Sequence, residues 1–170
     1  SILVNNAMTS YVFNGDDRKN AESISWDEIQ DHLNVTLKGS LNLIQALVPD
    51  KRNESFGRII TISSINGQKG EMGLINYSAA KAGVLGFTKA LAQDTARKNI
   101  TVNAVAPGYI DTDILADASE DFLKSLVGKI PVGRLGTVED VSRIVTFLAS
   151  DDAGFITGST ITANGGQYFT

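Results

Sequence analysis

The chain has 170 residues, 42% of them hydrophobic and 20% charged, which is the balance of one globular domain. Its net charge of −4 at pH 7 and its scattered basic residues give no support to a nucleic-acid or anionic-membrane partner. The absence of cysteine and the presence of one histidine, His32, exclude disulfides and metal sites built from thiolates or several histidines.

The first residues predict the end of a buried strand. Residues 1–4 are mostly apolar and β-prone, and no initiator Met precedes them. We therefore expect residues 1–170 to form a single domain that lacks an N-terminal segment. Residues 9–24 are polar and contain Asn14-Gly15-Asp16-Asp17, which predicts a loop.

A long helix is expected from about Trp26 to Val48, and Pro49 should end it. Apolar residues recur there every three or four positions, at Ile29, Leu33, Leu37, Leu41, Ile44 and Val48. The β-branched run from Gly57 to Ser63 predicts a buried strand, and residues 64–76 should form a Gly-rich loop.

The alternation of helices and strands continues to the end of the chain. The predicted segments are a helix from about Tyr77 to Lys98, a strand from Ile100 to Val105 stopped by Pro107-Gly108, a helix near Glu120 to Gly128 within the mixed segment 109–136, and a strand from Ser159 to Ala163. Thr137 should open one more helix, because Thr137-Val138-Glu139-Asp140 resembles a capping box with Asp in place of Glu or Gln.

This order of elements predicts an α/β fold with a doubly wound parallel sheet, similar to a Rossmann fold. Strands that alternate with helices of this length pair in parallel and are joined by right-handed crossovers. Ligands in such sheets bind outside the carboxyl ends of the strands. The residues that directly follow each strand are therefore the candidates for a functional site.

Three polar residues converge at that edge. Tyr77 and Lys81 are four residues apart on a predicted helix and so share a face. The Lys81 ammonium should lower the phenol pKa from about 10 and make Tyr77 a usable proton donor. Ser64 ends a strand thirteen residues earlier and can reach the same rim. Taken singly, each also fits an ordinary role, a surface tyrosine beside a solvated lysine or a loop hydroxyl bonded to its own backbone.

Together these residues resemble the ordered motifs of the short-chain dehydrogenase/reductase family. The matching segments are Asn5-Asn6-Ala7, Ser64, Tyr77-Ser78-Ala79-Ala80-Lys81 and Pro107-Gly108-Tyr109-Ile110-Asp111-Thr112, and the resemblance continues to Asn164-Gly165-Gly166. It implies that Tyr77 donates a proton, that Lys81 assists it and holds the nicotinamide ribose, and that Ser64 orients the substrate carbonyl. It also implies cofactor contacts at Asn5, Ala7, Tyr77, Lys81, Pro107, Gly108, Ile110 and Thr112. It implies no metal site.

The sequence departs from the family pattern in three places. No Gly-rich pyrophosphate loop precedes Asn5, and Met8 replaces the Gly that usually follows Asn-Asn-Ala. Many members carry a fourth catalytic residue, an Asn, where this chain has Thr36. Asn34 lies about 200° around the helix from Thr36 and is a poor substitute unless the helix is distorted.

The loop after Ser64 and the segment Asn76-Tyr77-Ser78-Ala79-Ala80-Lys81 look most like 3-oxoacyl and acetoacetyl-CoA reductases. The resemblance implies reduction of a 3-oxoacyl thioester by NADP(H) or NAD(H), with NADP(H) preferred although the contacts that decide between them are absent. The alternatives are a dehydrogenase of another secondary alcohol, such as a sugar, steroid or diol, and a truncated non-catalytic chain. A cytoplasmic location and a homotetramer of the full-length protein are also expected.

Overall fold

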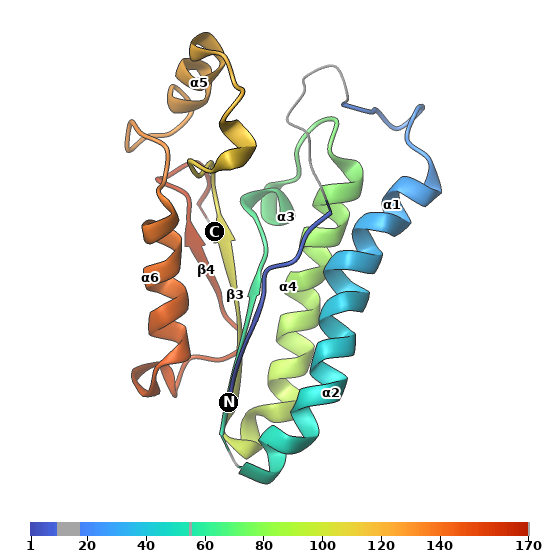
Figure 1. The fold of residues 1–170 in the computed structure, drawn as a ribbon, viewed down its shortest axis with the longest axis vertical. Helices are drawn as coiled ribbons and strands as arrows, with labels where there is room; N and C mark the ends of the chain where they lie inside the picture. The colour runs from blue at the N-terminus through green and yellow to red at the C-terminus, as the bar shows by residue number, and fades with distance from the viewer. Residues whose placement is uncertain (10–17, 55, 170) are drawn as a thin grey trace.

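The computed structural model describes residues 1–9, 18–54 and 56–169. Its centre is a sheet of four parallel strands in the order β1-β2-β3-β4 (Figure 1). The strands are β1 (Ile2–Asn5), β2 (Gly57–Ile62), β3 (Ile100–Pro107) and β4 (Thr160–Ala163). The predicted parallel α/β sheet is confirmed, while the loop signal at Asn14-Gly15-Asp16-Asp17 lies outside the described residues.

Helices cover both faces of the sheet (Figure 1). They are α1 (Trp26–Leu33), a π-helical turn η2 (Asn34–Lys38), α2 (Gly39–Glu54), α3 (Ile65–Lys69), α4 (Ile75–Thr95), α5 (Glu120–Val127) and α6 (Val138–Ala149), with short 3-10 turns η3 (Ala96–Lys98), η4 (Asp113–Leu115) and η5 (Asp151–Ala153). In the part of the chain that the structure describes, no helix has the length and apolar character that crossing a membrane requires.

Two apolar clusters join the layers. On one face α2 and α4 pack on the sheet through Ile44, Val48, Ile59, Ala92, Ile100 and Val102. On the other face α6 packs through Leu148, which meets Ile60 and Val105. Alternate residues of β2 and β3 thus point into different clusters, as the two-residue repeat of a strand requires.

The three connections between strands do not share one hand. Each connection leads to the next strand in the same direction across the sheet. The connections through α2 and α4 lie on one face of the sheet, and the connection through α6 lies on the other. The last crossover therefore has the opposite hand to the first two, and the expectation of right-handed crossovers throughout is wrong. The long segment between β3 and α6, residues 108–137, gives the chain the length to reach the far face.

The first long helix differs from its prediction at two points. A π-helical turn over Asn34–Lys38 interrupts it, and the helix continues through Pro49 to Glu54 instead of ending there. Proline has a φ angle that suits a helix, but it removes one N–H donor and its ring crowds the carbonyl four residues earlier, which weakens the helix. The helix therefore loses one backbone hydrogen bond at Pro49 without having to stop.

Local capping signals fix several helix starts. Thr137 and Asp140 form the predicted capping box at the start of α6. Ser64 caps a short helix, α3, where the sequence predicted only a loop, because its side chain accepts a hydrogen bond from the backbone N–H of Asn66. This cap matters for function, since it places Ser64 at the junction of β2 and α3.

Candidate active site

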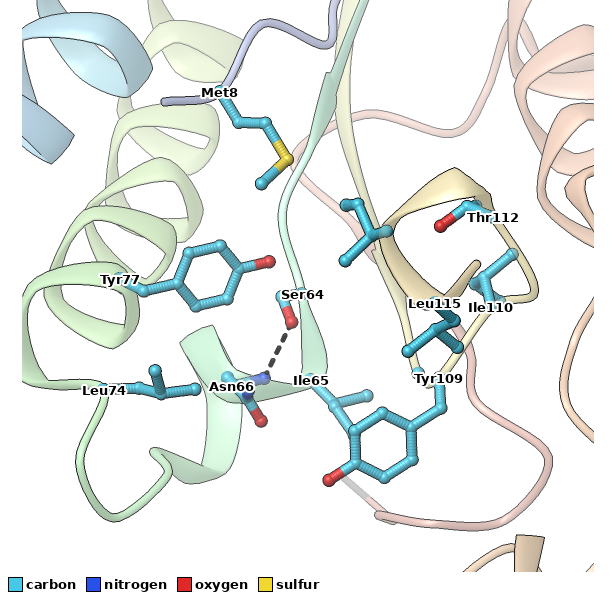
Figure 2. A pocket seen from close by; sticks show the side chains of 12 residues that line it. Met8, Ser64, Ile65, Asn66, Leu74, Tyr77, Tyr109, Ile110, Thr112 and Leu115 are labelled. Carbon is cyan, nitrogen blue, oxygen red and sulfur yellow. Dashed lines mark hydrogen bonds between the residues drawn. The ribbon is translucent and has the colours of Figure 1, made fainter. Parts of the chain in front are cut away.

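A pocket of about 210 Å³ opens beyond the carboxyl end of the sheet. It is lined by Met8, Ser64, Ile65, Asn66, Leu74, Tyr77, Gly108, Tyr109, Ile110, Thr112, Ile114 and Leu115. Figure 2 shows Tyr77 pointing across it from α4 toward the segment that follows β3. The structure therefore brings together Ser64, Tyr77 and residues of the Pro107–Thr112 motif, which the sequence placed at one edge.

Ser64 and Ser63 point to different sides of the chain at the end of β2. The Ser64 hydroxyl oxygen accepts a hydrogen bond of 3.1 Å from the Asn66 N–H and faces the pocket. The Ser63 hydroxyl donates a hydrogen bond of 2.8 Å to the Lys81 carbonyl and so ties β2 to α4. Ser64 thus presents its hydroxyl to the site, where it hydrogen bonds with Tyr77, as the alternation expected from the sequence requires.

Tyr77 lies in the first turn of α4 and is held as a neutral phenol. Burial raises the pKa of its hydroxyl, and a hydrogen bond with Ser64 lowers it in part. A phenol with a raised pKa keeps its proton at neutral pH. In this state Tyr77 can donate a proton to an oxygen atom that enters the pocket.

Lys81 is buried behind Tyr77, with 3% of its surface exposed. Its Nζ lies 5.7 Å from the centre of the Tyr77 ring and donates a hydrogen bond of 2.8 Å to the Ile62 carbonyl. Burial lowers the pKa of Lys81 to about 8. The sequence predicted that this ammonium lowers the pKa of Tyr77, and that prediction is wrong here, because burial dominates and raises it.

His32 is a neighbour of Tyr77 that the sequence did not predict. Its ring meets the Tyr77 ring edge-on, with 6.2 Å between the ring centres, and its Nδ1 lies 2.9 Å from the Thr9 hydroxyl. Burial lowers the pKa of His32, Asp31 opposes that shift and Lys81 adds to it. The imidazole is therefore biased toward its neutral form and supports the phenol ring from the side of α1.

The residues expected to hold a cofactor are distributed around the same edge. Asn5 is buried, and its Nδ2 lies 3.4 Å from the Thr61 hydroxyl, whereas Ala7 is exposed. Gly108, Ile110 and Thr112 line the pocket, and Pro107 is the last residue of β3.

Two backbone amides of that motif are already engaged. The Gly108 N–H donates to the Ala163 carbonyl and the Asp111 N–H to the Gly136 carbonyl. The family resemblance implies a cofactor contact at Gly108, for which the backbone amide would be the available donor. These two instead fix the segment to β4 and to the start of the α6 region.

Much of the remaining pocket wall could not be assigned from the sequence. Met8, Leu74 and Tyr109 come from three segments far apart in the chain and supply apolar surface (Figure 2). Asn66 supplies a buried polar group beside Ser64. The signal that could have found Asn66 is its place two residues after the serine in the cap, where it must lie close to the same rim.

The structure separates the two candidates for the fourth catalytic position. The helix is distorted at this place, since Asn34 and Thr36 both lie in the π-helical turn η2. Even so, Asn34 is exposed while Thr36 has 4% of its surface exposed. Burial therefore favours Thr36 as the residue that faces the interior next to α4.

Comparisons with known proteins identify the family of this chain and several similar reductases. A family model described as enoyl-(acyl carrier protein) reductase matches residues 1–168. Acetoacetyl-CoA reductases of Rhizobium meliloti and Shinella zoogloeoides are each 59% identical, over 85% and 81% of this chain. A 3-oxoacyl-(acyl-carrier-protein) reductase FabG of Pseudomonas aeruginosa is 46% identical over 85% of the chain. These matches span 59%, 57% and 58% of the relatives' own lengths, so the chain spans just under three fifths of the proteins it matches.

Proposed function

Since the chain belongs to the short-chain dehydrogenase/reductase family, we propose that the full-length protein reduces the 3-oxo group of an acyl thioester to a hydroxyl with a nicotinamide cofactor. The observation that carries this proposal is the meeting of Ser64 and Tyr77 at one wall of the pocket, with Lys81 buried directly behind. These are the three groups that carbonyl reduction needs from the protein.

The substrate class is supported by the relatives. Proteins named acetoacetyl-CoA reductase and 3-oxoacyl-(acyl-carrier-protein) reductase match the chain over most of its length. The pocket volume of about 210 Å³ lies below the roughly 300–1,000 Å³ of sites for drug-sized ligands, which favours a short acyl group. We therefore place acetoacetyl-CoA first among candidate substrates.

The residues present fit a nicotinamide cofactor at this edge. The Asn5 Oδ1 atom is buried and has no hydrogen-bond partner in the described part of the chain, so it can accept a hydrogen bond from a bound molecule. Ile110 and Thr112 face the pocket from the opposite side. When bound, the cofactor supplies a hydride, and the protein holds and polarises the carbonyl that receives it.

In reduction, the hydroxyls of Ser64 and Tyr77 hydrogen bond to the oxygen of the 3-oxo group. As the carbonyl carbon gains the hydride, the C–O double bond becomes single and its electron pair moves to oxygen. Tyr77 transfers its proton to that oxygen and completes the alcohol. Lys81, held by Ile62, places positive charge beside the phenolate that this transfer leaves.

The finer features of the proposal concern cofactor, assembly and location. NADP(H) is preferred over NAD(H), following the likeness of the Ser64 loop to 3-oxoacyl reductases. A homotetramer is proposed because α2 exposes Leu41, Leu43 and Leu47 to solvent. We also propose that the protein is located in the cytoplasm.

The test is turnover by the purified full-length protein. We expect acetoacetyl-CoA to be reduced, with faster oxidation of NADPH than of NADH at equal concentration, followed by the loss of absorbance of the reduced cofactor. Crotonyl-CoA, which offers a C–C double bond and no ketone, should not be reduced. Reduction of crotonyl-CoA without reduction of acetoacetyl-CoA would overturn the proposal in favour of an enoyl reductase.

A further inference from the structure

We propose that the side-chain amide of Asn66 binds the thioester carbonyl of the substrate and so selects 3-oxoacyl thioesters over ketones without a second carbonyl. This inference rests on the proposed function and assigns a specificity-determining role to a residue outside the Ser64, Tyr77 and Lys81 set. Asn66 lines the pocket two residues after Ser64, within α3. Figure 2 shows it beside Ser64, between Leu74 and Ile65 in this view.

One atom of the Asn66 amide, Oδ1, lacks the hydrogen-bond partner that its burial should require. Only 8% of the residue is exposed, and its Oδ1 is buried without a hydrogen-bond partner among the described residues. A buried polar atom left unpaired is costly, because it has given up its hydrogen bonds to water without a replacement. A group of the bound substrate that pairs with this amide would remove the cost, and the amide would then discriminate in favour of that group.

The backbone of Asn66 fixes where this amide can act. Its N–H donates to the Ser64 hydroxyl oxygen at 3.1 Å, so the two residues hold a constant relation at the rim of the pocket. The Ser64 hydroxyl in turn contributes to the hydrogen bond that lowers the pKa of Tyr77. A substrate oxygen bound by Ser64 and Tyr77 is therefore held next to the Asn66 side chain.

The chemistry of the substrate supplies a matching partner. In a 3-oxoacyl thioester a single methylene separates the ketone from the thioester carbonyl. An asparagine amide carries one acceptor and two donor hydrogens, and half a turn about its Cβ–Cγ bond exchanges their places. It can therefore present Nδ2 to the thioester oxygen while Ser64 and Tyr77 hold the ketone oxygen.

Among the described residues that line the pocket, Asn66 alone carries a side-chain amide. The neighbours of Asn66 on that side, Ile65 and Leu74, are apolar, and the pocket has Leu115 across from them. An apolar wall strengthens a single well-placed hydrogen bond because water competes less there. Asn66 is thus placed to bind the thioester oxygen in the transition state, and so to favour substrates that have this second carbonyl.

The test compares two CoA compounds that differ at one carbonyl. Acetoacetyl-CoA has the thioester oxygen, and S-(3-oxobutyl)-CoA replaces that C=O with a methylene while keeping the ketone and the CoA moiety. In the full-length protein, Asn66→Ala should lower kcat/KM for acetoacetyl-CoA about tenfold or more and leave kcat/KM for the thioether almost unchanged. Differences in ketone reactivity cancel, because each compound is compared between wild type and variant.

Two further variants keep the test decisive. Asn66→Asp preserves the shape of the side chain but removes its donors, and it should show the same selective loss. Gln68→Ala is the matched control, because Gln68 lies in the same short helix and also has a buried, unpartnered side-chain oxygen but does not line the pocket. It should leave the ratio of the two kcat/KM values unchanged.

Equal losses for both compounds in Asn66→Ala and Asn66→Asp would show a structural role and overturn the inference, as would no loss for either. Selective loss in Gln68→Ala would overturn it too, since burial alone would then account for the effect. A wild-type protein that reduces the thioether but not acetoacetyl-CoA overturns the inference while leaving a ketone reductase. A wild-type protein that reduces neither overturns the proposed function, and this inference with it.

Discussion

The Nζ of Lys81 lies 5.7 Å from the centre of the Tyr77 ring, one turn further along α4, and is held by the carbonyl of Ile62. Tyr77 is held separately, through its hydrogen bond with Ser64. The two side chains therefore depend on different parts of β2 and its end. Because of this separation, substitution of one should leave the position of the other intact, and their contributions can be measured apart.

Removal of the phenol hydroxyl should abolish most turnover. Tyr77→Phe keeps the ring that faces Lys81 and His32 and deletes only the hydroxyl, the proposed proton donor. A positioned general acid contributes about 10²- to 10⁴-fold, so kcat with acetoacetyl-CoA should fall by that factor. Cofactor affinity, measured by calorimetric titration, should stay close to wild type. Tyr168→Phe, outside the pocket, is the control, and near-normal turnover in Tyr77→Phe would contradict the assignment.

The buried Lys81 amine should make stability depend on pH in a defined window. Its folded-state pKa of about 8 lies below the ordinary value of 10.5. Between these values the unfolded chain binds a proton that the folded chain lacks, so the free energy of unfolding rises with pH, by up to about 3 kcal/mol. Below pH 8 the folded state carries the full cost of burying the charge.

Lys81→Met should remove this rise. Denaturant unfolding of the cofactor-free protein at pH 7.5 and pH 10 measures it, and the difference between wild type and variant isolates one group from all others. Lys89→Met changes an exposed lysine on the same helix and should retain the rise. An identical pH dependence in wild type and Lys81→Met would show that the Lys81 amine is not the group responsible.

The buried hydroxyl of Thr36 is expected to serve the site where many family members have Asn. Thr36→Val keeps the shape and should slow turnover roughly fivefold to tenfold, the effect of one hydrogen bond. Thr36→Asn should be tolerated, and Asn34→Ala should have little effect because Asn34 is exposed. Steady-state kinetics of the three variants decides the matter. A large loss in Asn34→Ala alone would move the assignment to Asn34.

Gly67 sets the distance between α3 and α4. A β-carbon on Gly67 would lie 2.6 Å from the carbonyl carbon and 2.7 Å from the carbonyl oxygen of Lys81, both backbone atoms that cannot yield easily. Gly67→Ala should therefore destabilise the protein by about 1–3 kcal/mol and displace the helix that Ser64 caps. Thermal unfolding and kcat together should report both effects.

Gly86 provides the contrasting substitution in α4. Nothing lies within 4 Å of a β-carbon built there, and the residue is exposed in a helix. Gly86→Ala should raise stability by about 0.5–1 kcal/mol, because alanine loses less backbone entropy on folding. If Gly67→Ala proved as harmless as Gly86→Ala, the close approach of α3 and α4 would not constrain the site.

The sequence predicted those features that local chemistry determines. The β-branched run of β2 and the Thr137–Asp140 capping box each depend on a few neighbouring residues, and both are found. Pro49 shows the limit of such rules. Its missing N–H weakens the helix, but the apolar face that contains Ile44 and Val48 keeps the helix on the sheet up to that point.

The site was predictable where residues directly follow strands, and not where distant segments meet. Ser64 and Tyr77 could be placed at one rim from topology alone. The direction of the Tyr77 pKa could not, because it depends on burial by residues from several elements. For the same reason Met8 and Asn66 emerged as parts of the pocket wall only in the folded chain.

The exposed leucines of α2 make the proposed assembly testable. Leu43 and Leu47 are 49% and 37% exposed and lie one helical turn apart, so they form an exposed apolar strip on α2 beside the face that packs on the sheet. If a second copy covers this strip in the full-length protein, Leu43→Glu with Leu47→Glu places charges in an apolar contact and should reduce the tetramer to smaller species in light scattering. Met72→Glu, at an exposed position outside α2, should leave the mass unchanged. A tetramer that survives both leucine substitutions would show that subunits meet through another surface, since two buried, unpaired carboxylates would be too costly to accommodate.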